Sequence, residues 1–225
     1  MAKLYAADQW IILDDVQFNR RDYQHRARLS DPRRPDHHQW LTLSAHLPAG
    51  RATLIRDVRL ADPTRCQRRL GQMLYERYRN NAHWRDFEPK LQRILELFDT
   101  TDRVAAIAEQ SARAMLEMLG WNGTIRRSSR YQTRPGRTGR LVDLTVVSGA
   151  THYLCGTGGA RYLTPRLFHK DGIGVILHRI PTEGIWHSGR TESAISILTQ
   201  MGGPQLKQSM QDLEAARAVT GRERG

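Results

Sequence analysis

The chain has 225 residues, 39% of them hydrophobic and 26% charged, which is enough for one domain with a sizeable core. No run approaches the ~20 apolar residues of a membrane span, and the N-terminus lacks the pattern of a secretory signal. The two cysteines form no disulfide framework, and no Cys/His cluster has zinc spacing. We therefore expect a cytoplasmic protein with no membrane span, no metal and no other cofactor.

The charge is strongly basic, with 35 Lys and Arg against 23 Asp and Glu and a formal net charge of +12. Four of these 35 residues are lysines, so the remaining 31 are arginines. A GC-rich genome produces this bias without functional meaning, whereas a basic surface favours anionic partners such as nucleic acid or phosphates. Both explanations stay open.

Short strands are predicted in the first 60 residues. An apolar run at residues 10–13 ends at two acidic residues and is typical of a buried strand. Further strands are predicted around residues 40–45 and 53–60. The segment 31–38, rich in proline and charge, predicts a hairpin or an exposed loop.

From Asp62 the apolar residues recur at helical spacing. Asp62 can cap a helix that has Pro63 at its first position and runs to Tyr78. A second helix is predicted at about residues 87–98, and a third runs from a cap at Asp102 to Gly120. We therefore expect a helical insertion at about residues 62–120.

Strands and helices alternate after Gly120. Strands are predicted at residues 123–129, 151–155 and 173–178, with helices at 138–150 and 164–172 between them, and a last helix from Glu192 to Met201. This alternation predicts an α/β domain over residues 1–204, with a mostly parallel sheet in Rossmann-like layers. Residues 205–225 are expected to form a polar tail.

A first group of candidate site residues follows the first strand. Asp14 and Asp15 stand where that strand emerges, which is where α/β proteins bind ligands. Neighbours on an extended segment point to opposite faces, so one of the two carboxylates is expected to face the site. The segment that follows can grip a phosphate or carboxylate, or it can form a salt-bridge network at a sheet edge. Its candidate binding residues are Gln17, Arg20, Arg21, Gln24 and Arg26.

A second group lies in the sequence THYLCGTGGARYLTP, residues 151–165. Its glycines, Gly156, Gly158 and Gly159, permit positive φ and a close approach of backbone amides to an anion, although a plain tight turn has the same composition. The loop lacks the GK[ST] ending of a nucleotide-binding P-loop. We expect Cys155, at the strand end, to be a packing residue and not a nucleophile.

A second basic cluster surrounds the sequence TRPGRTGR, residues 133–140. It could contact RNA or a phosphate-bearing carrier, or it could be a mobile surface loop. Its members are Arg126, Arg127, Arg130, Arg134, Arg137 and Arg140.

The two groups together resemble the WbqC-like protein family. LDDVQFNRRDYQHRARL, WLTLS and HYLCGTGGARYL carry the resemblance, which extends from about Lys3 to Gly202. This family is associated with bacterial surface-polysaccharide and natural-product gene clusters, and some members are labelled glycyl or other acyl transferases. Members typically begin with a further strand and a His-Gln-Pro segment before the LDDVQF strand, which predicts an unpaired sheet edge in this chain.

The resemblance implies an acyl- or aminoacyl-transferase that acts on an amino sugar or a related small acceptor. Asp14 or Asp15 would be the general base. Amides of the loop Gly156, Thr157, Gly158 and Gly159 would stabilise an oxyanion or hold a phosphate, with Tyr162 as a further binding residue. The donor would be activated and phosphate-bearing, such as an aminoacyl-tRNA or an acyl carrier. The alternatives are a non-catalytic RNA- or anion-binding module and a degenerate family member.

Overall fold

The computed structural model describes residues 1–31, 34–179, 183–185 and 193–222. The chain forms two compact units. Unit 1 contains Met1, residues 16–121 and the chain beyond residue 180, and unit 2 contains residues 2–15 and 122–180. Helices accompany strands in both units, and unit 2 holds two pairs of parallel strands, so the expected α/β class is confirmed.

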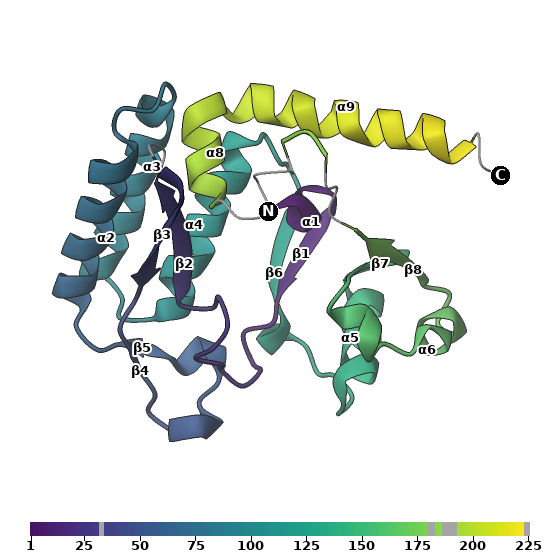
Figure 1. Cartoon of the computed structure of the whole chain (residues 1–225). Coiled ribbons are helices and arrows are strands. Elements are labelled where there is room, and N and C mark those ends of the chain that lie inside the picture. The colour runs from purple at the N-terminus through teal and green to yellow at the C-terminus, as the bar shows by residue number, and fades with distance from the viewer. Residues whose placement is uncertain (32–33, 180–182, 186–192, 223–225) are drawn as a thin grey trace. The chain divides into compact units, whose positions relative to one another are not determined.

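Three helices of unit 1 form the predicted helical insertion: α2 (Pro63–Tyr78), α3 (Trp84–Glu96) and α4 (Val104–Met118) (Figure 1). Asp62 caps α2 as expected, since its carboxylate accepts a hydrogen bond from the amide of Arg65 at 2.9 Å. Each helix buries one apolar stripe, which supplies most of the core of this unit. The largest fully buried side chains of these stripes are Tyr78, Phe87, Val104, Ile107 and Leu116.

The strands of unit 1 are antiparallel pairs. β2 (Arg26–Asp31) pairs with β3 (Arg34–Thr42), and the short β4 (Ala45–His46) pairs with β5 (Arg59–Leu60). The expected hairpin is therefore present, although Pro32 and Arg33 at its tip lie outside the described residues. Leu29 of β2 and Leu41 of β3 are buried in the same core as the helices.

Two expectations for unit 1 are wrong. Residues 53–60 form a 3₁₀ turn at Ile55–Asp57 and only a two-residue strand, because the amide of Ile55 bonds to the carbonyl of Val16 and draws the segment away from a ladder. Asp102 does not cap α4. Its carboxylate instead accepts two hydrogen bonds from Arg59, at 2.6 and 2.8 Å, and this pairing lowers the pKa of Asp102.

The C-terminal part of unit 1 is helical. α8 (Ala194–Met201) is capped by Ser193, and α9 (Gly203–Arg222) follows it. Leu206 and Met210 of α9 are buried, so the segment predicted as a polar tail begins with an apolar contact. Glu192, the predicted start of α8, lies outside the described residues. No helix in the described ranges is both long and apolar enough to cross a membrane.

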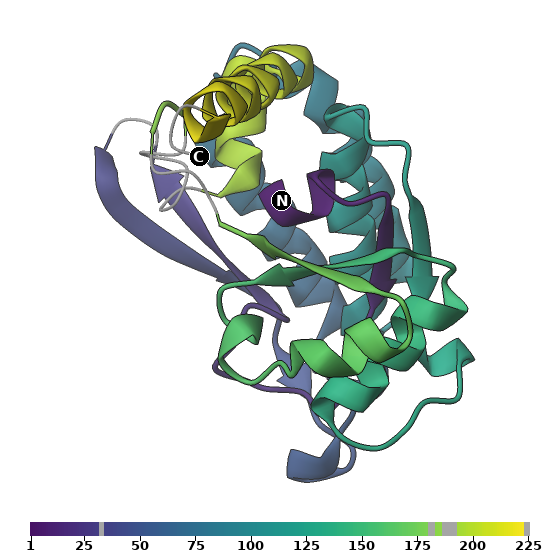
Figure 2. The same ribbon diagram turned by 90° about the vertical axis from the view of Figure 1, so that its right-hand side faces the viewer.

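Unit 2 contains the parallel strands. β1 (Gln9–Ile12) pairs with β6 (Thr124–Arg127), and β7 (His152–Gly156) pairs with β8 (Gly174–His178). The helices α5 (Arg137–Val147) and α6 (Pro165–Lys170) pack on the β7–β8 pair through Val142, Phe168 and Ile173 (Figure 2). Within the described chain each pair stands alone, as expected for a sheet with an unpaired edge. A short helix, α1 (Ala2–Tyr5), precedes β1.

The connection from β6 through α5 to β7 is a β–α–β crossover. Gln9, at the start of β1, donates a hydrogen bond from its amide nitrogen to the carbonyl of Ser148, just after α5. Asp15, just after β1, forms an ion pair with Arg140 in the first half of α5. Helix α5 therefore runs antiparallel to β1 and β6, so that β7 starts at the same end of the unit as β1.

His25 of unit 1 supplies a test of this packing by pH. Its side chain is buried, its Nδ1 atom has no hydrogen-bond partner among the described residues, and burial, followed by the charges of Arg26 and Arg20, lowers its pKa. The unfolded chain takes up a proton near pH 6.5 whereas the folded chain resists it. Stability should therefore be full above pH 6.5 and fall as the pH drops toward the folded pKa, by at most about 1.4 kcal/mol per pH unit.

Urea unfolding between pH 7.5 and 5 measures this dependence. We expect His25→Gln to flatten the curve in that window, and His169→Gln, at an exposed site, to leave it unchanged. A wild-type slope that survives His25→Gln would show that another group causes it.

Candidate functional site

The carboxyl ends of β1 and β6 bring acidic and hydroxyl side chains together in unit 2. Asp14 and Asp15 lie in the turn after β1, and Ser128 and Ser129 lie in a 3₁₀ turn after β6. Because the two strands are parallel neighbours, their ends meet at one edge. Asp14 accepts hydrogen bonds from the amide of Ser129 at 2.9 Å, its hydroxyl at 2.7 Å and the Ser128 hydroxyl at 3.2 Å.

Asp14 is a buried and fully hydrogen-bonded carboxylate, 5% exposed. Burial alone would raise its pKa, but the hydrogen bonds from Ser129 and Ser128 outweigh burial and lower it. The side chain is therefore held ionised, with both oxygens occupied. This environment suits a residue that fixes the ends of two strands and makes a weak proton acceptor.

Asp15 has a different environment. It accepts a hydrogen bond from the Ser128 hydroxyl and forms an ion pair with Arg140 of α5, and its side chain is 17% exposed. Because both aspartates lie in a turn and not on the strand, both reach Ser128, and the expected opposite orientation is wrong. Asp15 is the more accessible of the two carboxylates.

The glycine-rich turn at the end of β7 forms the second part of unit 2's candidate site. Gly156 ends the strand, and a 3₁₀ turn follows at Gly159–Arg161. The amides of Thr157 and Gly158 donate no backbone hydrogen bond to the described residues, so they are available to an anion. The expectation of positive φ is wrong, because Gly156, Gly158 and Gly159 all have ordinary backbone angles.

Gly159 is required by packing. A Cβ atom at this position would lie 2.9 Å from the Sγ atom of Cys155, whereas a Cβ at Gly158 would meet nothing within 4 Å. We expect Gly159→Ala to destabilise the protein by about 1–3 kcal/mol, the usual cost of overpacking. Gly158→Ala is the matched control and should change the midpoint of urea unfolding little. Equal effects of the two substitutions would contradict this explanation.

The first turn of α5 connects the two parts of the site. Arg140 pairs with Asp15, and the guanidinium of Arg137 lies over the ring of Tyr162 at 5.3 Å from its centroid. Residues three apart on a helix are neighbours on its surface. The turn after β1 and the residues after the glycine-rich turn therefore contact adjacent side chains of one helical turn.

Cys155 has the features of a packing residue. It is 1% exposed, its thiol donates to the carbonyl of Gly156 at 3.3 Å, and burial raises its pKa, with Lys3 opposing that shift. A nucleophilic cysteine needs a lowered pKa and access to substrate. The geometry therefore supports the expectation of a packing role.

The remaining predicted binding residues belong to unit 1 and hold their own loop. Arg20 donates to the carbonyl of Ala45 at 3.2 Å, and Arg26 donates to those of Asp22 and Arg21 at 3.3 and 2.7 Å. These bonds go to backbone carbonyls. The alternative salt-bridge network is absent here, because the described residues provide no carboxylate partner for Arg20, Arg21 or Arg26. Gln17 and Gln24 also bond to backbone, at Arg51 and Asn19.

An aromatic and cationic group lies on this part of unit 1. The guanidinium of Arg26 lies 4.4 Å from the ring centroid of Trp40, and the ring of Tyr23 lies 5.6 Å from that of Trp40. Tyr23 is 63% exposed and Trp40 is 38% exposed. Exposed rings beside an arginine are the kind of surface on which nucleic-acid bases stack.

The second arginine cluster divides among separate partners in unit 2. Arg134 pairs with Asp143 and Asp171, and Arg126 donates to the hydroxyl of Tyr131 at 3.3 Å. Arg140 and Arg137 belong to the candidate site. The expectation of a single anion-binding patch is therefore unsupported by these contacts.

Ser128, Ser129 and Arg140 are site residues that the sequence analysis did not single out. The two serines directly follow a predicted strand, which was the same signal that marked the aspartates. Applying that rule to both parallel strands would have found them. Arg140 was visible only as one of many arginines, because its partner is fixed by the crossover of α5.

Comparison with known proteins identifies relatives without assigning a reaction. The chain matches the model of the WbqC-like protein family over residues 1–198. It is 26% identical over 168 residues to the uncharacterised protein Rv1507c of Mycobacterium tuberculosis, an alignment that covers 75% of this chain and 71% of that protein. No solved structure matches it significantly. The chain belongs to the WbqC-like protein family.

Proposed function

We propose that this protein transfers an acyl or aminoacyl group from an activated donor to an amino sugar or a related small acceptor, in surface-polysaccharide or natural-product biosynthesis. The observation that carries the proposal is Asp15, a partly exposed carboxylate at the carboxyl end of a parallel strand, with an arginine beside it. Ligands bind at this end of α/β sheets. Family membership supports it through the acyl-transferase labels of some members.

Asp15 would act as the general base. The amine or hydroxyl of the acceptor attacks the carbonyl carbon of the donor, Asp15 takes its proton, and the bond from that carbon to the donor's leaving oxygen or sulfur breaks. The leaving group then receives the proton. A donor phosphate that pairs with Arg140 would free an oxygen of Asp15 for this step.

The glycine-rich turn would stabilise the negative charge that develops on the donor carbonyl oxygen. The amides of Thr157 and Gly158 are the available donors for that oxyanion, and Tyr162 would position the acceptor. Asp14 would keep the strand end rigid. Arg20, Arg21 and Arg26, with Gln17 and Gln24, would bind the donor from unit 1.

A transfer assay tests the proposal. The purified protein is incubated with total tRNA charged with labelled amino acids, or with acyl carrier thioesters, and a panel of nucleotide-linked amino sugars. The expected result is a product heavier than the sugar by one acyl or aminoacyl residue, formed in proportion to enzyme. Absence of product across the panel, with a protein shown to be folded, would count against the transferase.

A non-catalytic single-strand RNA-binding module is the second candidate, favoured by the exposed Tyr23–Trp40–Arg26 group. Affinity for unrelated 20-nucleotide RNAs should then fall linearly with the logarithm of salt concentration. Trp40→Ala should weaken binding by about 1–3 kcal/mol, the value of one base–aromatic stack. Tyr75→Ala is the control, since Tyr75 is also exposed and also lies beside an arginine, Arg79.

A further inference from the structure

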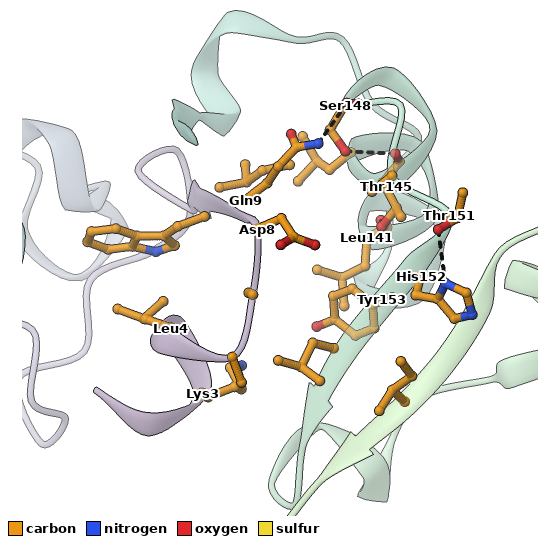
Figure 3. A pocket seen from close by; sticks show the side chains of 18 of the residues that line it. Lys3, Leu4, Asp8, Gln9, Leu141, Thr145, Ser148, Thr151, His152 and Tyr153 are labelled. Carbon is orange, nitrogen blue, oxygen red and sulfur yellow. Dashed lines mark hydrogen bonds between the residues drawn. The ribbon is translucent and has the colours of Figure 1, made fainter. Parts of the chain in front are cut away.

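A cavity of about 550 Å³ lies inside unit 2. The segment from α1 to the end of β1 forms one wall, and the start of β7 forms the opposite wall, as Figure 3 shows with Leu4 and Gln9 facing His152 and Tyr153. Leu141 and Leu144 of α5 contribute apolar side chains to the lining. The cavity is distinct from the cluster of Asp14, Asp15 and Ser128, none of which lines it.

The two walls are strand edges. Within the described chain β1 pairs with β6 alone, and β7 pairs with β8 alone, so the edge of each strand away from its partner has no ladder. Parallel sheets in α/β proteins are normally buried and continuous, and two-stranded sheets are marginal. Main-chain donors and acceptors on these edges require partners.

The walls also run in the same direction. The crossover from β6 through α5 places the start of β7 at the same end as the start of β1. A third strand between them, parallel to both, would join the two pairs into one five-stranded parallel sheet. β1 has four residues and β7 has five, so such a strand would pair over four or five residues.

A buried polar atom marks the cavity as a binding site. The Oε1 atom of Gln9 lies at the lining, is inaccessible to solvent, and has no hydrogen-bond partner among the described residues. The Nε2 atom of the same side chain is fixed by its bond to Ser148 at 3.2 Å. An acceptor held in this way requires a donor, and a main-chain amide of a bound strand supplies one.

We propose that this cavity binds one extended apolar peptide strand from outside residues 1–225, which pairs with β1 on one edge and with β7 on the other. Main-chain edges select a peptide over a small apolar molecule, because only a strand satisfies both ladders. The apolar lining from α5 selects valine and isoleucine side chains, which are typical of buried parallel strands.

Hydrogen exchange on the full chain tests the proposal with a defined probe, the capped peptide KVIVIVK. Bound peptide should slow exchange of amides in both β1 and β7 by at least about tenfold, and leave α2 unchanged. Successive amides of a strand point to opposite edges, so two control peptides carry N-methyl groups on one edge or on the other. Both should bind at least about tenfold more weakly, because each loses one ladder.

Two neighbouring substitutions on β8 provide a matched pair. Ile176 lines the cavity and is 49% exposed, whereas Leu177 is 41% exposed and does not line it. We expect Ile176→Glu to weaken peptide binding at least about tenfold and Leu177→Glu to leave it unchanged, with both variants folded because both sites face solvent.

Three outcomes would overturn the proposal. Full affinity of either N-methylated peptide would place the probe at an outer strand edge. Protection of β1 and β7 that rises with protein concentration alone, with dimerisation in sedimentation, would assign the cavity to a second copy of this chain. Absence of protection at millimolar peptide, with the wild type folded, would show that no strand enters.

Discussion

Replacement of Asp14 by alanine is expected to lower the free energy of unfolding by about 3–5 kcal/mol, since hydrogen bonds to charged groups are strong and the abandoned donors are buried. The substitution leaves the hydroxyl of Ser128 and the amide of Ser129 without their acceptor at the junction of β1 and β6. Urea unfolding at pH 7 measures this loss.

Asp86→Ala is the control for this prediction. Asp86 pairs with His83 but its side chain is 64% exposed, so its removal should cost less than about 1 kcal/mol. A loss below about 1 kcal/mol for Asp14→Ala would contradict the structural role assigned to the buried carboxylate.

The same carboxylate predicts a pH dependence of stability. Its pKa in the folded protein lies below the ordinary value of 3.8. The stabilisation is therefore fully present above pH 3.8 and is lost as the pH falls through the folded value. Between pH 5 and 3 the wild type should lose more stability than Asp14→Ala does.

Asp15→Asn is expected to reduce the rate of acyl transfer by about 10²–10⁴, the usual contribution of a general base, and to leave the fold intact. The amide cannot take a proton from the acceptor but keeps the shape of the side chain. This prediction depends on the proposed function, and the measurement is kcat with the donor and acceptor found in the transfer assay.

Asp143→Asn is its matched control. Asp143 also pairs with an arginine of unit 2, and its side chain is 21% exposed against 17% for Asp15, but it lies on α5 and pairs with Arg134. It should leave kcat within about twofold. If both variants lose activity equally, loss of an ion pair explains the effect and the base is elsewhere.

Elements with a strong period were predictable from the sequence. α2 follows from Asp62, Pro63 and a regular apolar stripe, and β1 follows from an apolar run that ends in acidic residues. These signals are local, so they survive without knowledge of the rest of the fold. The parallel pairing of β1 with β6 also follows the predicted alternation.

Features that depend on distant contacts were not predictable. Residues 53–60 resemble a strand, but bonds to Val16 and Phe18 pull them into a turn. Asp102 resembles a cap, but Arg59, far away in sequence, takes its carboxylate. The site shows the same limit, because the pairing of Asp15 with Arg140 requires the crossover of α5, which composition does not reveal.

A double-mutant cycle tests most directly whether the turn after β1 and the glycine-rich turn of β7 serve one site. It measures kcat/KM for wild type, Asp15→Asn, Tyr162→Phe and the double variant. If both side chains act on the same bound substrate, we expect the combined loss to differ from the product of the single losses by about 0.5–3 kcal/mol. Losses that multiply within about 0.3 kcal/mol would contradict a single site around the first turn of α5.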